Sequence, residues 1–235
     1  MIVKKEVFDN GRIVLYHADC MDVLPYIIEK VDAVICDPPY GVGWQTAHRK
    51  PDSVRFDVIH NDDEVVADWI PMLGNLLASS ACLFMFTRWD VEHEWRAAAA
   101  NSGWNVRSQV IWYKPGGSMG DLRTQFSPSH ENAIFAIKGD WQFPDKRPLS
   151  VYVFNRDAHV KYEHPTQKPV SLLSRIVLDI TAKDQLVLDP FFGSCPVGVA
   201  CARFKRRYIG IEVNREYFEL GCRNVERELA QLSLF

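Results

Sequence analysis

Apolar residues along the chain follow two spacings in turn, and these predict strands and helices that alternate. Short apolar runs, typical of buried strands, fall at residues 12–16, 31–36, 81–87, 104–113, 131–138, 186–189 and 208–212. Helical spacing falls at residues 20–29, 64–79, 91–102, 170–181, 197–204 and 215–231. The pattern predicts an α/β fold, in which a mostly parallel sheet carries helices on both faces.

Length and composition favour one domain. The chain has 235 residues, of which 47% are hydrophobic, enough for one large core. We therefore expect residues 1–235 to form a single domain. Within it, residues 114–163 are the least regular stretch and are rich in Pro, Gly, Asp and Arg, so we interpret them as an insertion rather than a core layer.

The sequence shows no membrane span, no signal peptide and no paired cysteines, and these features bear on localisation and on the redox state of the thiols. Apolar runs stay well short of the roughly 18 to 20 residues of a membrane span, and the start, MIVKKEVFDNGRIVLYH, has no apolar signal-peptide core. We expect a cytoplasmic protein that does not contact membranes. The six cysteines are scattered and include no C-x-x-C pair, which favours free thiols over disulfides and predicts no metal site.

Net charge gives only a weak indication of the partner. The value is −3, which argues against a nucleic acid because phosphate binding needs clustered Lys and Arg. However, residues 101–168 carry nine basic and six acidic side chains, whereas residues 1–100 carry nine and sixteen. The basic middle could meet DNA, and ordinary scatter of surface charge explains it equally well.

Acids at the ends of predicted strands mark the candidate chemistry, since ligands of parallel α/β sheets bind at the carboxyl ends of strands. Asp189 is followed by P-F-F-G-S-C, and Glu212 ends the next predicted strand. Their separation is close to the roughly 20 residues between a cofactor-binding turn and the acid that bonds ribose hydroxyls. The alternative is a tight turn followed by a surface glutamate.

A third strand end carries D-P-P-Y at residues 37–40. The two prolines make a stiff, extended loop, in which the Asp37 carboxylate and the Pro38 carbonyl are acceptors. The Tyr40 ring could lie over a planar ligand. Two acceptors and a ring suit the exocyclic amine of a nucleobase, and the alternative is a turn with a surface tyrosine.

Four motifs in this order resemble the amino-methyltransferases that methylate adenine N6 or cytosine N4 in DNA with S-adenosylmethionine. They are H-A-D-C at 17–20, D-P-P-Y at 37–40, H-P-T-Q-K-P-V at 164–170 and D-P-F-F-G-S at 189–194. The catalytic motif precedes the main cofactor motifs, as in the permuted β group. The resemblance implies a Rossmann-like methyltransferase fold with circularly permuted motif order, and S-adenosylmethionine as the cofactor.

The resemblance also implies residue roles. Asp37, Pro38, Pro39 and Tyr40 form the catalytic motif: Asp37 and Pro38 hold the amine, and Tyr40 stacks on a flipped-out base. The implied cofactor residues are Asp19 near the adenine, Thr166 and Lys168 near the methionine end, Asp189, Phe191, Gly193 and Ser194 in the loop, and Glu212 on the ribose. From the residues alone, Asp19 could equally cap a helix, and H-P-T-Q-K-P could be only the start of one.

One position departs from the family pattern. The family has G-S-G-T-T where this chain has Gly193-Ser194-Cys195-Pro196-Val197. Cys195 supplies a side chain where the backbone should pass close to the cofactor, so we expect weaker cofactor binding. The alternative function is a weakly active or inactive DNA-binding module of the same fold.

DNA contacts are assigned to two regions. Trp44 could wedge or stack against DNA, or it could only anchor its loop. Arg49 and Lys50 are expected to bind DNA phosphates. The segment 114–163 is the expected target-recognition segment, with basic residues Arg123, Lys146, Arg147, Arg156 and Lys161. We expect double-stranded DNA as substrate, with adenine N6 as the target because D-P-P-Y is the commoner adenine form, and cytosine N4 as the alternative.

The sequence contains no nuclease motif, which fits a solitary methyltransferase or the modification half of a restriction system, from a bacterium or a phage. We expect a monomer or a homodimer. Residues 231–235, Q-L-S-L-F, resemble the peptide by which bacterial replication and repair proteins bind the sliding clamp. The alternative is that Leu232, Leu234 and Phe235 fold back onto their own domain.

Overall fold

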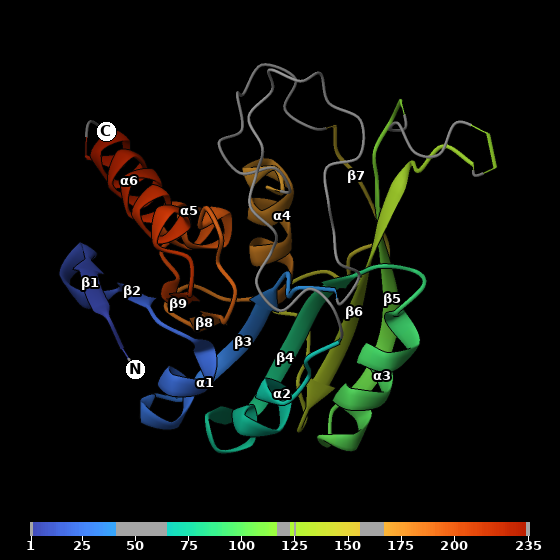
Figure 1. The fold of residues 1–235 in the computed structure, drawn as a ribbon, viewed down its shortest axis with the longest axis horizontal. Helices are drawn as coiled ribbons and strands as arrows, with labels where there is room; N and C mark the ends of the chain where they lie inside the picture. The colour runs from blue at the N-terminus through green and yellow to red at the C-terminus, as the bar shows by residue number, and fades with distance from the viewer. Residues whose placement is uncertain (1, 41–64, 117–122, 125, 156–166, 234–235) are drawn as a thin grey trace.

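The computed structural model describes residues 2–40, 65–116, 123–124, 126–155 and 167–233, which form one sheet between two layers of helices (Figure 1). The strand order is β1-β2-β9-β8-β3-β4-β6-β5-β7. The strands are β1 (Lys4–Phe8), β2 (Ile13–His17), β3 (Val31–Cys36), β4 (Leu77–Thr87), β5 (Asn105–Tyr113), β6 (His130–Lys138), β7 (Val151–Val153), β8 (Leu186–Asp189) and β9 (Arg207–Glu212).

Most strand pairs are parallel, as predicted. The continuous run β2-β9-β8-β3-β4 is parallel throughout, and β5 pairs with β7 in parallel. Only β1–β2, β4–β6 and β5–β6 are antiparallel among the described strands. Since β6 runs against both of its neighbours, its first residues lie at the same edge of the sheet as the carboxyl ends of the parallel strands.

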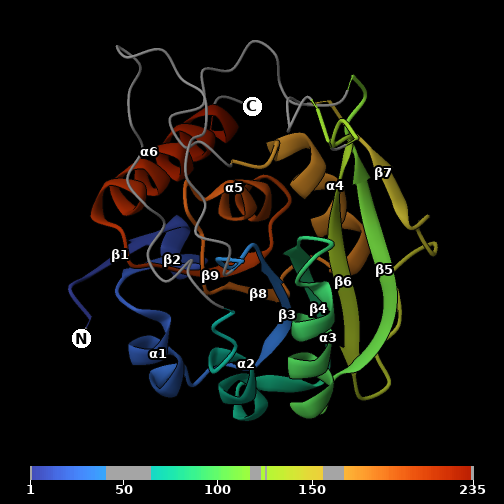
Figure 2. The ribbon, with the colours of Figure 1, turned by 45° about the vertical axis from the view of Figure 1, so that its right-hand side comes forward.

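Helices cover both faces, as the alternating pattern predicts (Figures 1 and 2). One face carries α1 (Cys20–Val23), α2 (Trp69–Met72) and α3 (Glu92–Asn101), and the other carries α4 (Val170–Ile180), α5 (Pro196–Arg203) and α6 (Arg215–Leu232). Each layer buries its own apolar cluster against the sheet. Short 3-10 turns are η1 (Asp9–Gly11), η2 (Leu24–Tyr26) and η3 (Leu73–Asn75).

Two predicted helices are wrong in length. The predicted helix 20–29 stops at Val23 and continues as a 3-10 turn, because Pro25 has no N–H to extend the α-helical ladder. The predicted helix 64–79 is reduced to a short helix and a 3-10 turn, and β4 begins at Leu77, where the backbone pairs with Val31. Sheet pairing overrides the helical spacing there. The sequence pattern also missed the short terminal strands β1 and β7.

The interpretation of residues 114–163 as an insertion outside the core is wrong for its middle. Residues 130–138 are β6, which pairs with both β4 and β5 and buries Ala133, Ile134 and Phe135. Strand β7 also adds the buried Tyr152 to the core, whereas Arg123, Lys146 and Arg147 are exposed.

The cysteines are free thiols, as predicted, and all but the half-buried Cys222 are buried. No helix in the described ranges has the length and apolar character needed to cross a bilayer.

Candidate active site

Three acids stand at one edge of the sheet, where parallel strands end. Asp37 follows β3, Asp189 ends β8 and Glu212 ends β9. The chain moves outward from β3 to β4 in one direction and from β8 to β9 in the other, so the strand order reverses between β3 and β8. Ligands of open α/β sheets bind at such a reversal, which places the candidate site above β3 and β8.

The glycine loop after β8 is held by Glu212. Gly193 adopts a left-handed conformation, with φ of 54°, and its N–H donates to Glu212 Oε2 at 2.9 Å. The other carboxylate oxygen accepts from the backbone N–H of Asn214 at 2.7 Å. Burial raises the pKa of Glu212 to about 7, against the opposing effect of these backbone donors. Glu212 therefore joins the glycine loop to the end of the next strand.

Ser194 extends the same loop toward the segment before α4. Its hydroxyl donates to Gln167 Oε1 at 2.8 Å, and its carbonyl accepts from Asn224 Nδ2 at 2.9 Å. The D-P-F-F-G-S loop and the described end of the H-P-T-Q-K-P-V motif are thus in direct contact, although 27 residues separate the two partners in sequence.

Asp189 points into the protein and supports the loop from below. It is 2% exposed, and its carboxylate accepts from the Phe191 N–H at 3.1 Å and from the Tyr208 hydroxyl at 3.2 Å. Burial is the main reason that the pKa of Asp189 is raised to about 8, and the nearby charges of Asp37 and Glu212 add to it. The side chain shapes the loop rather than facing a ligand.

Cys195 turns its side chain away from the loop surface. Its φ of 64° is left-handed, which explains why a glycine would suit the position. The side chain is fully buried, and its thiol donates to the Tyr208 hydroxyl at 3.8 Å. The expected intrusion of Cys195 toward a cofactor is therefore not what the geometry shows.

Asp19 and Phe191 are two further described residues of the predicted cofactor set. Asp19 caps α1 by accepting from the Met21 N–H at 2.9 Å, which is the capping role left open by its sequence. The preceding residue, Ala18, donates to the Glu212 carbonyl at 3.0 Å, so Asp19 lies near the end of β9. Phe191 is half-buried and meets Trp69 edge-on, with ring centroids 5.3 Å apart.

The Asp37 carboxylate of the D-P-P-Y motif is bound by two side chains of the protein. One oxygen of Asp37 accepts from the Tyr40 hydroxyl, and the other accepts from the Lys168 ammonium, both in very short contacts. Burial and the charge of Asp37 hold the pKa of Tyr40 well above its usual value. Tyr40 is half-buried, and its hydroxyl is bound to Asp37 of its own motif.

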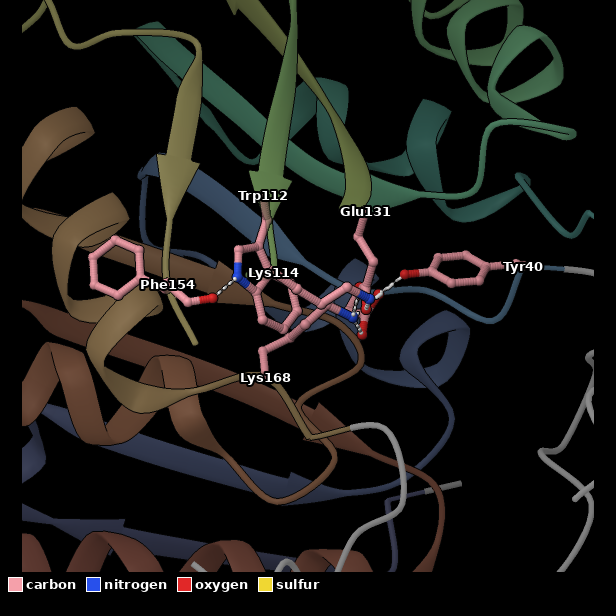
Figure 3. Close-up of polar contacts among 7 residues, drawn as sticks. Tyr40, Trp112, Lys114, Glu131, Phe154 and Lys168 are labelled. Atoms are coloured by element: carbon pink, nitrogen blue, oxygen red, sulfur yellow. Dashed lines mark hydrogen bonds and ion pairs between the residues drawn. The ribbon is translucent and has the colours of Figure 1, made fainter. Parts of the chain in front are cut away.

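Lys168 lies between the carboxylates of Asp37, in the loop after β3, and Glu131, in β6. Figure 3 shows Lys168 beside Glu131. Besides Asp37, Lys168 contacts Glu131 at 3.1 Å, and Glu131 is bound on its other oxygen by Lys114 at 2.9 Å. Burial works to lower the pKa of Lys168, but the charges of Asp37 and Glu131 outweigh it and raise the pKa. The pKa of Glu131 is lowered to about 2 because the two lysines overcome the effect of burial.

Sequence reasoning missed Glu131 and Lys114. Both stand at strand ends of the same edge, Glu131 at the start of β6 and Lys114 after β5. A polar residue at the buried end of an apolar strand was the available signal, but the antiparallel direction of β6 had to be known to place it beside Asp37.

Several predicted residues lie outside the described ranges. These are Thr166 among the cofactor residues and Trp44, Arg49, Lys50, Arg156 and Lys161 among the DNA residues. Arg123 and Arg147 are described and exposed.

A mostly parallel sheet with a glycine loop at its switch point, held by an acid at the next strand end, defines a Rossmann-like α/β fold. Residues 31–223 match the N6_N4_Mtase family, described as DNA methylase, and the chain belongs to this family. It is therefore a DNA methyltransferase of the N6-adenine or N4-cytosine type.

Individual relatives agree with this assignment. DNA adenine methyltransferase YhdJ of Escherichia coli K12 is 26% identical over 93% of this chain and 84% of its own length. The crystal structure of the M1.HpyAVI complex with SAM matches 91% of this chain and 99% of that chain, with a TM-score of 0.72 and 25% identity. The cytosine-N4-specific PvuII DNA methyltransferase has the same fold, with a TM-score of 0.73 at 15% identity over 99% of this chain and 95% of that chain.

Proposed function

We propose that this protein transfers a methyl group from S-adenosylmethionine to the exocyclic N6 of an adenine in double-stranded DNA. The observation that carries the proposal is the position of Asp37, a hydrogen-bond acceptor beside the glycine loop at the switch point of the sheet. The resemblance of D-P-P-Y to the family's catalytic motif supports the same assignment.

The cofactor loop suits S-adenosylmethionine. Gly193 provides a left-handed turn without a side chain, and Glu212 stands at the next strand end, where an acid can bind ribose hydroxyls. Ser194 and Gln167 bring the lid motif onto the loop. Bound there, the cofactor supplies an electrophilic methyl group on a sulfonium, and the residues of this chain orient the amine toward it.

Asp37 and the Pro38 carbonyl are the acceptors for the target amine. The lone pair of an aromatic amine is delocalised into the ring, which makes it a poor nucleophile. Two acceptors that hold both N–H groups favour a tetrahedral nitrogen, whose lone pair is then available for attack on the methyl group. Methyl transfer would form the C–N bond as the C–S bond of the sulfonium breaks, and the proton that leaves the nitrogen would pass to the Asp37 carboxylate or to solvent.

The base must leave the duplex to reach this loop. Flipping costs a few kcal/mol of pairing and stacking, and stacking on Tyr40 offsets about 1–3 kcal/mol of it. We propose that the exposed Arg123 and Arg147 contact DNA phosphates, together with the basic residues of the regions outside the described ranges.

The motif and one named relative favour adenine over cytosine. D-P-P-Y is the commoner adenine form in the family, and the relative YhdJ is named as a DNA adenine methyltransferase. The structural neighbour PvuII is cytosine-N4-specific, so cytosine N4 is the second candidate.

Methylation of unmodified plasmid DNA, read by nucleoside mass spectrometry, tests the proposal. We expect N6-methyladenine from the wild-type protein and a rate lower by about 10²–10³ for Asp37→Asn, which loses one charged acceptor. Asp184→Asn is the matched control, because Asp184 is exposed and pairs with Arg12 at the opposite edge of the sheet. N4-methylcytosine would establish the second candidate, and no modified base would refute the proposal.

We also propose that residues 231–235 bind the bacterial sliding clamp. Helix α6 ends at Leu232, which is 41% exposed, and Gln231 is also exposed, so neither is packed into the core. An exposed peptide with apolar anchors suits binding in a groove. Deleting residues 231–235 should abolish clamp pull-down and leave methylation of short oligonucleotides unchanged, and retained pull-down would refute the idea.

A further inference from the structure

The Asp37 carboxylate, which is the proposed acceptor for the target amine, already accepts hydrogen bonds from two side chains of the protein. Lys168 and Tyr40 each donate to one oxygen of Asp37, so a base amine must displace at least one of them before it can bind. Lys168 is 5% exposed and its ammonium lies 4.8 Å from the centre of the Phe86 ring. A buried ammonium cannot simply be released, because an unpaired charge in the interior is costly.

Glu131 is a second carboxylate partner for the Lys168 ammonium. Its Oε2 already contacts the ammonium at 3.1 Å, and its Oε1 is held by Lys114 at 2.9 Å. Lys114 is itself fixed over the Trp112 ring at 5.2 Å, and the Trp112 indole donates to the Phe154 carbonyl at 2.9 Å (Figure 3). Asp37, Lys168, Glu131 and Lys114 thus form an ionic array. Its Glu131 end is anchored from two further strands, whereas its Asp37 end lies in the loop that must receive the base.

The charges of the array balance with the amine in place. Asp37 and Glu131 carry two negative charges, and Lys114 and Lys168 carry two positive charges. The incoming amine is neutral, so moving Lys168 wholly onto Glu131 leaves the net charge unchanged and keeps every ammonium beside a carboxylate.

We propose that Lys168 closes the amine site of the free enzyme by binding Asp37, and that Glu131 is the positioning residue that takes Lys168 when the base enters. This inference rests on the proposed function. Without Glu131, Lys168 would keep Asp37 as its carboxylate partner and compete directly with the target amine. Removing Lys168 as well would leave Asp37 open.

The test is a double-variant cycle on plasmid methylation at saturating S-adenosylmethionine. Glu131→Gln should lower kcat/KM for DNA by about tenfold or more, since displacement of Lys168 then has no alternative carboxylate. The double variant Glu131→Gln with Lys168→Met should recover most of that loss. A role for Glu131 in structure alone predicts no recovery, because a second deletion in a buried ionic array adds to the damage.

Two variants control for the loss of an ionic group elsewhere in the protein. Glu228→Gln removes a buried carboxylate paired with Arg203, and Lys138→Met removes a lysine at the opposite end of β6. Both should leave kcat/KM unchanged, and melting temperatures of all variants identify any failure to fold.

The outcomes separate the two proposals. Recovery in the double variant supports the inference, and a double variant that is as slow as Glu131→Gln, or slower, overturns it. An inactive Lys168→Met single variant also overturns it, because Lys168 would then act in the reaction rather than close the site. Absence of methylation by the wild-type protein would overturn the proposed function and this inference with it.

Discussion

Burial of Asp189 should make the stability of the protein depend on pH in a direction opposite to that of a salt-bridged carboxylate, whose pKa is lowered on folding. The pKa of this side chain is raised from 3.8 to about 8 in the folded state, chiefly by burial. Between these values the folded chain holds a proton that the unfolded chain has released. The free energy of unfolding therefore falls as pH rises through this window, and the favourable contribution is lost above about pH 8.

Asp189→Asn tests this directly, because asparagine has nearly the same shape and no charge. The pKa shift is about four units, and at 1.36 kcal/mol per unit the contribution is on the order of 5 kcal/mol across the window. The amide of the substituted side chain would keep a carbonyl oxygen for the Phe191 N–H, so the loop keeps its support. We expect the variant to gain stability over the wild type by several kcal/mol as pH rises.

Urea unfolding of both proteins between about pH 5 and about pH 9 measures the difference. Glu212→Gln is a useful comparison, because the pKa of Glu212 is raised from 4.5 to about 7 and its difference curve should level off sooner. Wild-type and Asp189→Asn curves that run parallel over the whole range would show that Asp189 is charged in the folded protein, and the reasoning from burial would be refuted.

Three further substitutions test the cofactor loop. Glu212→Gln should weaken S-adenosylmethionine binding by about tenfold or more, measured by calorimetry, because one amide oxygen replaces two acceptors and one backbone N–H loses its partner. Gly198→Ala should destabilise the protein by about 1–3 kcal/mol in urea unfolding, since its Cβ would lie 2.9 Å from Tyr208 Cε1 and closer still to the Cys195 thiol. An unchanged midpoint would show that the packing there is loose. Cys195→Gly should change cofactor affinity by less than about threefold, because the side chain faces Tyr208, and a large gain would show that Cys195 obstructs the cofactor.

Local patterns of the sequence were sufficient to predict most of the sheet and the two loops that matter. The strand 31–36 and the strand 186–189 were predicted with the bounds that the structure has, because each is a mostly apolar run followed closely by an acid and a proline. Their loops, D-P-P-Y and D-P-F-F-G-S, have conformations set largely by proline and glycine, whose backbone preferences are local.

Patterns failed where a long-range contact overrode a local preference. Leu76 and Leu77 fit a helix as well as a strand. Leu77 belongs to β4 only because it pairs with Val31. The strand at residues 131–138 was predicted to within one residue of β6, but its central place in the sheet was not. Its position between β4 and β5 depends on antiparallel pairing with both, which no local pattern encodes.

The sequence by itself therefore determined which residues could carry the chemistry, because Asp37, Gly193 and Glu212 belong to motifs whose spacing is local. Tertiary structure decided what each side chain faces. It turned Cys195 inward beneath the loop and brought Lys168, 131 residues away in sequence, onto Asp37. It also placed Glu131 beside that pair. The physical reason is that hydrogen bonds and ion pairs act over a few ångströms in space, and only the folded sheet brings the ends of its strands within that range.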